Sequence, residues 1–461
     1  MKTTQTLSGC GDIRLERRGG ILLEAFEHSK NSSIHKTFGE YRDQKAAYRF
    51  FANSRVTEDH FIKTMSESCG IRSNGRRVLA ICDTSTINTN AKIGRITNFE
   101  GLGIISRNQT KSAIGFFMHP IYVEDEMDGT PYGLADIKLY NRSMERSTND
   151  RSKRDVFRSI PIEEKESIKW VDPCIDARDG VLREAAHITY VMDREGDIIE
   201  VFERIPSSRA DVIVRNTHNR NIINELGEKL RLYDQLASQE ASDSYEIELK
   251  GKKKTIKIKW GSCHILAPRG YQLETPLAAS YVEVCEITKG DSSEKPIHWI
   301  LISSKEISTD IQAKELVWTY QRRWNIEVFF KLMKSDGFNI EKTELETGSA
   351  IRKLTLMIMQ ASIKILQLKA ARTGGTDLLV TDVFNDDEIR CLEILNKKLE
   401  GATEKQQNPY IKVHLSWASW IIARLGGWKE FYDRSRPPGN KTFRAGLEKF
   451  DSIIFGLNLK E

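Results

Sequence analysis

The sequence predicts an α/β protein with a strand-containing centre and helical ends. Residues 78–82 and 188–192 are continuous apolar runs, which are typical of strands buried on both faces of a sheet. A short helical pattern at 198–204 and a third apolar run at 212–215 follow the second strand, and this strand–helix–strand order is typical of an α/β core. Roughly the first 65 and the last 90 residues carry apolar side chains at helical spacing.

Composition is that of a soluble globular protein. The 461 residues suffice for two or three domains, with 39% hydrophobic and 29% charged residues. A net charge of +5 is too mild to indicate a nucleic-acid partner by itself. The seven cysteines include no C-x2-C pair, which predicts free thiols in a reducing compartment. Without a secretory segment, a long apolar run or a Walker-type loop, we expect a cytoplasmic protein with no membrane partner and no nucleotide cofactor.

The N-terminal segment is predicted to be a small helical module that binds DNA. An apolar stripe at helical spacing runs through residues 21–26, and a second helix covers 45–51. The basic residues on the polar faces are candidate DNA contacts, although a solvated basic helix is the alternative. These candidates are Arg14, Arg18, Lys45 and Arg49. Gly19 and Gly20 are expected to interrupt the first helix, because each glycine costs about 1 kcal/mol in a helix interior.

The segment 220–305 is predicted to be a strand-rich insertion. Residues 245–250 and 255–260 alternate apolar and polar side chains, which predicts a hairpin with a basic turn at 251–254. A long helix then begins near Ser308 or Thr309, either of which can cap it, and runs to about Lys334.

Four residues of this helix are spaced so that they share one face. Offsets of 3, 7 and 14 residues place Tyr320, Arg323, Glu327 and Lys334 within about 60° of one another. Apolar residues, together with Trp318, fall on the opposite side. One carboxylate between two cations and a phenol suits a site that holds a metal ion and phosphates. The alternative is an exposed helix whose charges form ordinary ion pairs.

Two further acids end the predicted central strands. Asp83 follows the run 78–82 and Asp193 follows 188–192. Because the ends of adjacent parallel strands meet at one edge of a sheet, Asp83, Asp193 and Glu327 are predicted to converge. Clustered carboxylates need a cation, and oxygen ligands favour Mg²⁺ or Mn²⁺. A strand-end aspartate is otherwise a turn former or a helix cap, which is our interpretation of Asp197.

The spacing Y-x2-R-x3-E-x6-K resembles the signature of bacterial insertion-sequence DDE transposases, in the family that includes the transposase of transposon five. The strings beginning at Asp83 and Asp193, the opening helix and the tail at 436–447 resemble the same family in the same order. The resemblance implies an RNase H-like catalytic core interrupted by a β-insertion. The implied domains are a helical DNA-binding domain at 1–66, the catalytic domain at 67–372 and a helical C-terminal dimerisation domain at 373–461.

The resemblance also implies the activity. Two Mg²⁺ ions, for which Mn²⁺ substitutes, would be ligated by the three acids, and the enzyme would cut transposon end DNA through a hairpin intermediate and join it to target DNA. It implies a homodimer on paired ends in the bacterial cytoplasm, associated with the nucleoid. Phosphate contacts are implied for Tyr320, Arg323 and Lys334, base stacking for Trp299 or else Trp324, and a DNA contact for Arg215. The alternatives are a nuclease without strand transfer and a non-catalytic DNA-binding regulator.

Overall fold

The computed structural model describes residues 7–29, 31–107, 112–142, 160–249, 252–287, 295–429 and 437–458. The chain forms two compact units. The first, called unit 1, comprises Met1–Asn74, Thr84–Glu145 and Ile326–Glu461, and the second, called unit 2, comprises Gly75–Asp83 and Arg146–Asn325.

Unit 2 is built on a mixed sheet. Its strand order is β1-β6-β7-β13-β12-β11-β8-β9, and β10 pairs with β11. The strands β1, β6 and β7 are parallel, and the other pairs are antiparallel. The bounds are β1 Arg77–Cys82, β6 His187–Met192, β7 Ala210–Arg215, β8 Asn221–Asn224, β9 Lys229–Arg231, β10 Asp243–Leu249, β11 Lys252–Ile265, β12 Leu277–Glu286 and β13 His298–Ser303. The predicted central strands are therefore confirmed as β1, β6 and β7.

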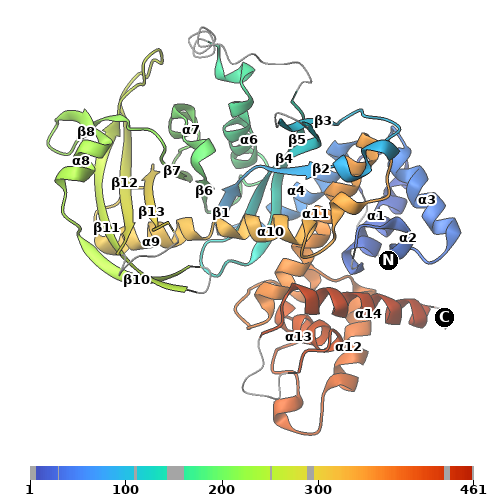
Figure 1. The fold of residues 1–461 in the computed structure, drawn as a ribbon. Coiled ribbons are helices and arrows are strands. Elements are labelled where there is room, and N and C mark those ends of the chain that lie inside the picture. Colours follow the sequence, from blue (N-terminus) through green and yellow to red (C-terminus); the bar gives the residue numbers. More distant parts are fainter. Residues whose placement is uncertain are drawn as a thin grey trace. The chain divides into compact units, whose positions relative to one another are not determined.

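Helices cover this sheet (Figure 1). They are α6 Asp172–Asp179, α7 Ile199–Arg204, α8 Leu232–Ser238 and α9 Asp310–Gln321. Thr309 caps α9, because its side chain accepts a hydrogen bond from the Gln312 N–H, as expected for one of the two candidate caps. The helix α9 packs against β12, and it brings Tyr320 against Trp299 of β13.

The single helix predicted from residue 308 to 334 is broken. Helix α9 ends at Gln321, and α10 (Trp324–Lys334) begins three residues later. At the break the N–H groups of Arg322 and Arg323 bond to carbonyls three residues back, at 3.2 and 3.0 Å, which tightens the turn and interrupts the helical ladder. The prediction of one continuous helix is therefore wrong, while the shared face of Tyr320, Arg323, Glu327 and Lys334 stays a prediction. Trp318, predicted to be on the apolar face, is 48% exposed.

The predicted basic turn of the hairpin is shorter than expected. Leu249 of β10 pairs with Lys252 of β11, so Lys252, Lys253 and Lys254 are strand residues. The rest of the predicted turn, residues 250–251, lies outside the described residues. Because side chains alternate along a strand, neighbouring lysines point to opposite faces of the sheet rather than sharing one tip.

Unit 1 contains the N-terminal helices and a second group of strands. The helices are α1 Ile13–His28, α2 Ile34–Thr37, α3 Tyr41–Ala52 and α4 Glu58–Ser73, and the strands are β2 Ser85–Asn88, β3 Gly103–Arg107, β4 Ser112–Asp125 and β5 Pro131–Tyr140. Strand β4 pairs antiparallel with each of the other three. Asn53 ends α3 and Thr57 precedes α4 as their caps.

Helix α1 runs unbroken through Gly19 and Gly20, which corrects the predicted interruption. Both glycines are buried. A Cβ on Gly19 would lie 2.7 Å from the Leu7 Cβ and 3.3 Å from Phe50 Cζ. The glycine therefore allows α1 to approach its neighbours closely, and packing offsets its low helix propensity.

The core of unit 1 is α11, Gly348–Ala371. It contacts α1, α3, α4 and β5. By length and composition α11 could cross a membrane, but 83% of its most apolar window is buried, as in the core helix of a globular fold. The remaining helices are α12 Asp386–Leu399, α13 Leu415–Leu425 and α14 Asn440–Asn458. All seven cysteines are free thiols, as predicted.

Candidate active site

The carboxyl ends of β1 and β6 bring two acids to one edge of the sheet in unit 2. The strands are parallel neighbours, and Cys82 pairs with Met192. Asp83 and Asp193 are the next residue of each strand, and both are half-buried. Asp193 accepts a hydrogen bond from the Glu195 N–H at 2.8 Å, which caps a short 3₁₀ turn and orients its carboxylate. The predicted meeting of these two strand ends is present.

Arg323 contacts the first of these acids. Its Nη1 donates to Asp83 Oδ2 at 3.0 Å, and the side chains are only 11% and 16% exposed. Low exposure strengthens a charge-assisted hydrogen bond because little water screens it. Arg323 lies in the break between α9 and α10, and its guanidinium lies 5.5 Å from the centroid of the Trp324 ring. The carboxylate and the cation thus form one charged pair at the sheet edge.

Tyr320 and Trp299 pack together beside this pair. Tyr320 is 3% exposed, and its ring lies 5.6 Å from that of Trp299 at 65°. Burial raises the pKa of Tyr320, while the charges of Arg323 and Arg215 oppose the shift and Asp193 reinforces it. Burial disfavours the charged form of Arg215 as well, which lowers its pKa. Tyr320, Arg323, Arg215 and Asp193 therefore lie close enough for their charges to affect one another.

A basic cavity with aromatic walls adjoins the same residues. Its volume is about 450 Å³. The side chains that line it are Arg194, Arg215, Lys252, Lys254, Lys295, Pro296, Ile297, His298, Trp299 and Trp324. Five cations and two indoles around one hollow are a combination that suits a phosphate backbone and exposed bases. We refer to it below as the basic cavity.

Glu327 and Lys334 belong to unit 1. Glu327 is half-buried on α10, while Lys334 near the end of that helix donates to Ser85 Oγ at 2.7 Å. Burial lowers the pKa of Lys334, against the opposing charge of Glu341. Ser85 is two residues beyond Asp83 in the chain. The convergence of Glu327 with the two aspartates stays a prediction.

Asp197, which we interpreted as a turn former or a helix cap, does not cap α7; it closes the short 3₁₀ turn after Asp193. Ile198 occupies the N-cap position of α7. The Asp197 carboxylate is buried, is paired with Arg220, and accepts hydrogen bonds from the N–H and the hydroxyl of Thr217 at 2.6 and 2.9 Å. It therefore ties the segment after β6 to the segment after β7.

The four N-terminal candidates lie on α1 and α3. Arg14, Lys45 and Arg49 are exposed. Arg18 is half-exposed and lies 3.7 Å from Asp43, so part of its charge links α1 to α3. Lys45 lies 5.9 Å from the centroid of the Tyr41 ring. The contact of these four residues with DNA stays a prediction.

The donor set at the sheet edge fits a hard divalent cation. Asp83 and Asp193 offer only carboxylate oxygens, which are the ligands that Mg²⁺ and Mn²⁺ prefer. A guanidinium on Asp83 is a natural stand-in for positive charge, because two neighbouring carboxylates repel each other without one.

Sequence reasoning missed several residues of the basic cavity. Arg194 and His298 were assigned no role, and Lys295 was not singled out. Arg194 follows Asp193 directly, so its place at the sheet edge was available as a signal. Lys254 was expected in the basic turn of the hairpin, yet its side chain is mostly buried and pairs with Glu286 at 2.9 Å.

Two matches to models of protein families agree with this geometry. Residues 6–56, which contain α1 to α3, match the family described as transposase DNA-binding. Residues 174–363 match the transposase DDE domain, a domain that generally uses divalent metals. The second match includes Asp193, Arg323 and Glu327, while Asp83 precedes it. The chain thus carries a transposase DNA-binding domain and a transposase DDE domain, and these support its identification as an insertion-sequence DDE transposase.

Proposed function

We propose that the protein is a cut-and-paste DNA transposase of the family that includes the transposase of transposon five. The observation that carries the proposal is the pair Asp83 and Asp193 at neighbouring strand ends, with Arg323 on Asp83 and the basic cavity beside them. The DNA-binding and DDE matches supply the class of substrate. Acids for a metal and cations for phosphates are the two requirements of phosphodiester chemistry.

Asp83, Asp193 and Glu327 are the proposed metal ligands, and Mg²⁺ is the proposed ion, with two ions in each site and Mn²⁺ as a substitute. When bound, such ions activate water and stabilise the leaving oxygen of an in-line displacement at phosphorus. The protein fixes the ligands: β1 and β6 hold the two aspartates, and the Glu195 N–H orients Asp193. The proposed RNase H-like core is the scaffold that brings Glu327 to them.

Each proposed step exchanges one phosphorus–oxygen bond for another. Water first attacks one strand at the transposon end and releases a 3′-hydroxyl. That hydroxyl attacks the opposite strand, which forms the hairpin and releases the 3′-hydroxyl of the flanking DNA. Water then opens the hairpin, and the restored 3′-hydroxyl attacks target DNA. Because all four are in-line displacements at phosphorus, one site serves each of them.

The cations and rings take the proposed DNA contacts. Arg323, Tyr320 and Lys334 hold phosphates near the transferred end, where the planar guanidinium gives bidentate contact. Arg215 and the lysines of the basic cavity follow the backbone. A hairpin requires a sharp bend, so Trp299, or Trp324 as a second candidate, stacks on a displaced base. Arg14, Arg18, Lys45 and Arg49 bind the end sequence.

The proposal includes a homodimer that holds two transposon ends, with the segment 373–461 as its dimerisation domain. It also places the protein in the bacterial cytoplasm at the nucleoid. A transposase must pair two ends before joining both to one target, and a symmetric dimer meets that need.

The test supplies purified protein with the DNA ends of its own element and Mg²⁺. Nicked, hairpin and strand-transfer products should appear in that order on denaturing gels. Asp83→Asn, Asp193→Asn and Glu327→Gln should each abolish all three products. Glu184→Gln is the matched control, because this carboxylate on the surface of unit 2 is 66% exposed and pairs only with a neighbouring arginine side chain at 3.3 Å among the contacts of the described residues.

The outcomes separate the alternatives. Cleavage without a hairpin or joined product would indicate a nuclease without strand transfer. End binding without any cleavage by the wild-type protein would indicate a DNA-binding regulator. Undiminished cleavage by the three acid variants would overturn the assignment of the metal ligands.

A further inference from the structure

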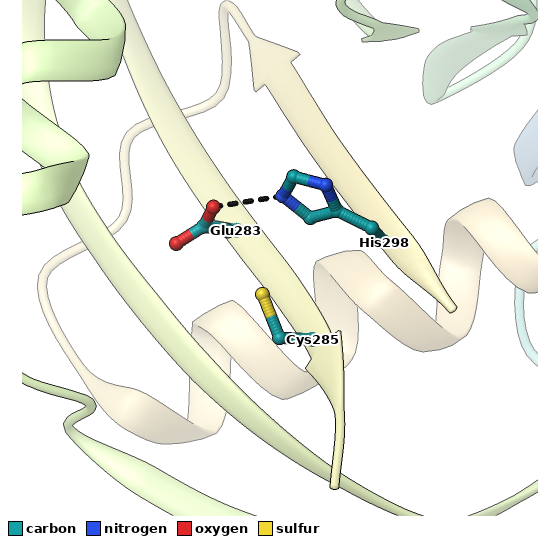
Figure 2. A group of neighbouring side chains, drawn as sticks. All are labelled: Glu283, Cys285 and His298. Carbon is teal, nitrogen blue, oxygen red and sulfur yellow. Dashed lines mark hydrogen bonds and ion pairs between the residues drawn. The ribbon is translucent and has the colours of Figure 1, made fainter. Parts of the chain in front are cut away.

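A second group of potential metal ligands lies on β12 and β13. Unlike Asp83 and Asp193, it contains a thiol and an imidazole as well as a carboxylate. Glu283 and Cys285 are two residues apart on β12 and therefore share a face of the sheet. His298 of β13 pairs directly with Cys285. One ligand atom from each of the three lies within 4.8 Å of the other two (Figure 2).

The sheet itself organises these side chains. Trp299, the next residue after His298, packs on Tyr320 of α9, so His298 points to the opposite face. Its Nε2 is 2.9 Å from Glu283 Oε1, and Cys285 lies beside both (Figure 2). The His298 side chain is 59% exposed, which gives an ion a path from solvent.

The ligand types select a kind of ion. A thiolate and an imidazole are poor ligands for Mg²⁺, but with a carboxylate they form a common set for Zn²⁺. Ligand atoms around a tetrahedral zinc ion are roughly 3.3–3.8 Å apart, given metal–ligand bonds of about 2.0–2.3 Å. The three ligand atoms, which lie within 4.8 Å of one another, therefore need to move only slightly closer together to bind one zinc ion.

The surroundings provide the support that metal-binding carboxylates require. Lys259 Nζ lies 3.4 Å from Glu283 Oε2, which is the oxygen that does not face His298. Lys259 is itself anchored, since it donates to the Leu236 carbonyl at 2.6 Å. Side chains that bond to the free oxygen of a metal-binding carboxylate, as Lys259 does here, fix the orientation of that carboxylate.

We propose that Glu283, Cys285 and His298 form a zinc site that cross-links β12 and β13, with water at the remaining position. The inference does not depend on the proposed function. Bound zinc would fix the start of β13, where His298 lines the basic cavity and Trp299 follows. The same histidine lines a second cavity of about 500 Å³, together with Arg194, Arg215 and Glu283. Zinc would thus set the position of a shared wall of both cavities.

The test titrates the metal-free full-length protein with CoCl₂ in excess MgCl₂, which occupies sites that contain only carboxylates. Cobalt serves as the spectroscopic probe because a thiolate ligand gives a sulfur-to-cobalt charge-transfer band in the near ultraviolet. We expect that band at about one cobalt per chain, and its loss when ZnCl₂ is added. Lys259→Met should weaken cobalt binding by about 10-fold.

Matched cysteine variants make the outcome specific. Cys285→Ala and His298→Ala should remove the band or shift it to much higher cobalt concentration. Cys263→Ala, a buried thiol on the neighbouring strand β11, should leave it unchanged. Circular dichroism of each variant verifies its fold. No band in the wild-type protein, or an undiminished band in Cys285→Ala, would overturn the site.

Discussion

Arg323 Nη1 donates a hydrogen bond to Asp83 Oδ2 across 3.0 Å, and both side chains are nearly buried. The pair joins the tight turn after α9 to the end of β1. A guanidinium there neutralises Asp83 and competes with any cation that the carboxylate would ligate. We infer that Arg323 exchanges partners when DNA and metal bind, from the carboxylate to a phosphate.

Substitutions of Arg323 should separate these two roles. Arg323→Lys keeps the charge but loses the planar fork, so single-turnover cleavage of end DNA should slow by about 10- to 100-fold, as expected for loss of a charged hydrogen bond of about 1.5–3 kcal/mol. Arg323→Ala should be slower still, yet should reach its maximal rate at lower Mg²⁺ concentration because the competing cation is gone. Arg322→Lys, whose parent guanidinium lies over the Trp318 ring, is the matched control. Wild-type rates and Mg²⁺ dependence in both Arg323 variants would contradict the idea.

Trp299 is expected to act after the first nick. Its ring packs on Tyr320 and lines the basic cavity. Trp299→Leu removes a stacking surface worth about 1–3 kcal/mol per base, so hairpin formation should slow by about 10- to 100-fold while the first nick proceeds near the wild-type rate. Quenched time courses resolve the two products. Trp318→Leu, at an exposed tryptophan of α9, should change neither step. Equal slowing of both steps by Trp299→Leu would indicate a packing role alone.

A buried charge cluster in unit 1 should make stability depend on pH. His28 of α1 lies 2.9 Å from Glu388 of α12, and Lys364 of α11 contacts Glu388 at 3.2 Å and Glu27 at 3.1 Å. Burial and the charge of Lys364 oppose protonation of His28, but hydrogen bonds to Asp451 and Glu388 outweigh them and raise its pKa to about 9. Burial also opposes ionisation of Glu388, yet Lys364 and His28 hold its pKa at about 2.

The direction of the effect follows from His28. Its pKa is higher in the folded state than the usual 6.5, so its stabilisation is complete below pH 6.5 and is lost as pH rises through about 9. The free energy of unfolding should fall over that window by on the order of 3 kcal/mol. Urea denaturation at several pH values checks this. His28→Gln should flatten the dependence, whereas His264→Gln, at an exposed site on β11, should preserve it. A wild-type stability that rises across the window would contradict the cluster's role.

The candidate site was partly predictable because its two aspartates follow a local rule. Apolar runs define β1 and β6, and the residue after each run must lie at the edge of the sheet. Arg323 was found through its spacing from Tyr320. The break between α9 and α10, in which Arg323 lies, was not predictable, because neither glycine nor proline marks residues 322–323. It is visible only as backbone hydrogen bonds of the tight turn.

The other features were not predictable because they depend on contacts between segments that are distant in the sequence. Lys364 sits in a long and mostly apolar helix, and the sequence pattern gives no sign that it pairs with Glu27 and Glu388, which are 337 and 24 residues away. The basic cavity likewise collects residues from several strands and the start of α10. Such sets depend on which segments pack together, which no local periodicity encodes.

Substitution of Gly19 compares local helix propensity with tertiary packing, because the two predict opposite changes in the free energy of unfolding. Gly19→Ala gains up to about 1 kcal/mol of helix propensity. Its new methyl group, however, would stand 2.7 Å from the Leu7 Cβ, and overpacking of this kind costs about 1–3 kcal/mol. We expect a net destabilisation on the order of 1 kcal/mol in urea denaturation. Gly456→Ala is the matched control, since Gly456 is an exposed residue of α14 with nothing within 4 Å of an added Cβ, so it should stabilise. Stabilisation by both substitutions would mean that α1 tolerates the methyl group and that Gly19 is not required for its close packing.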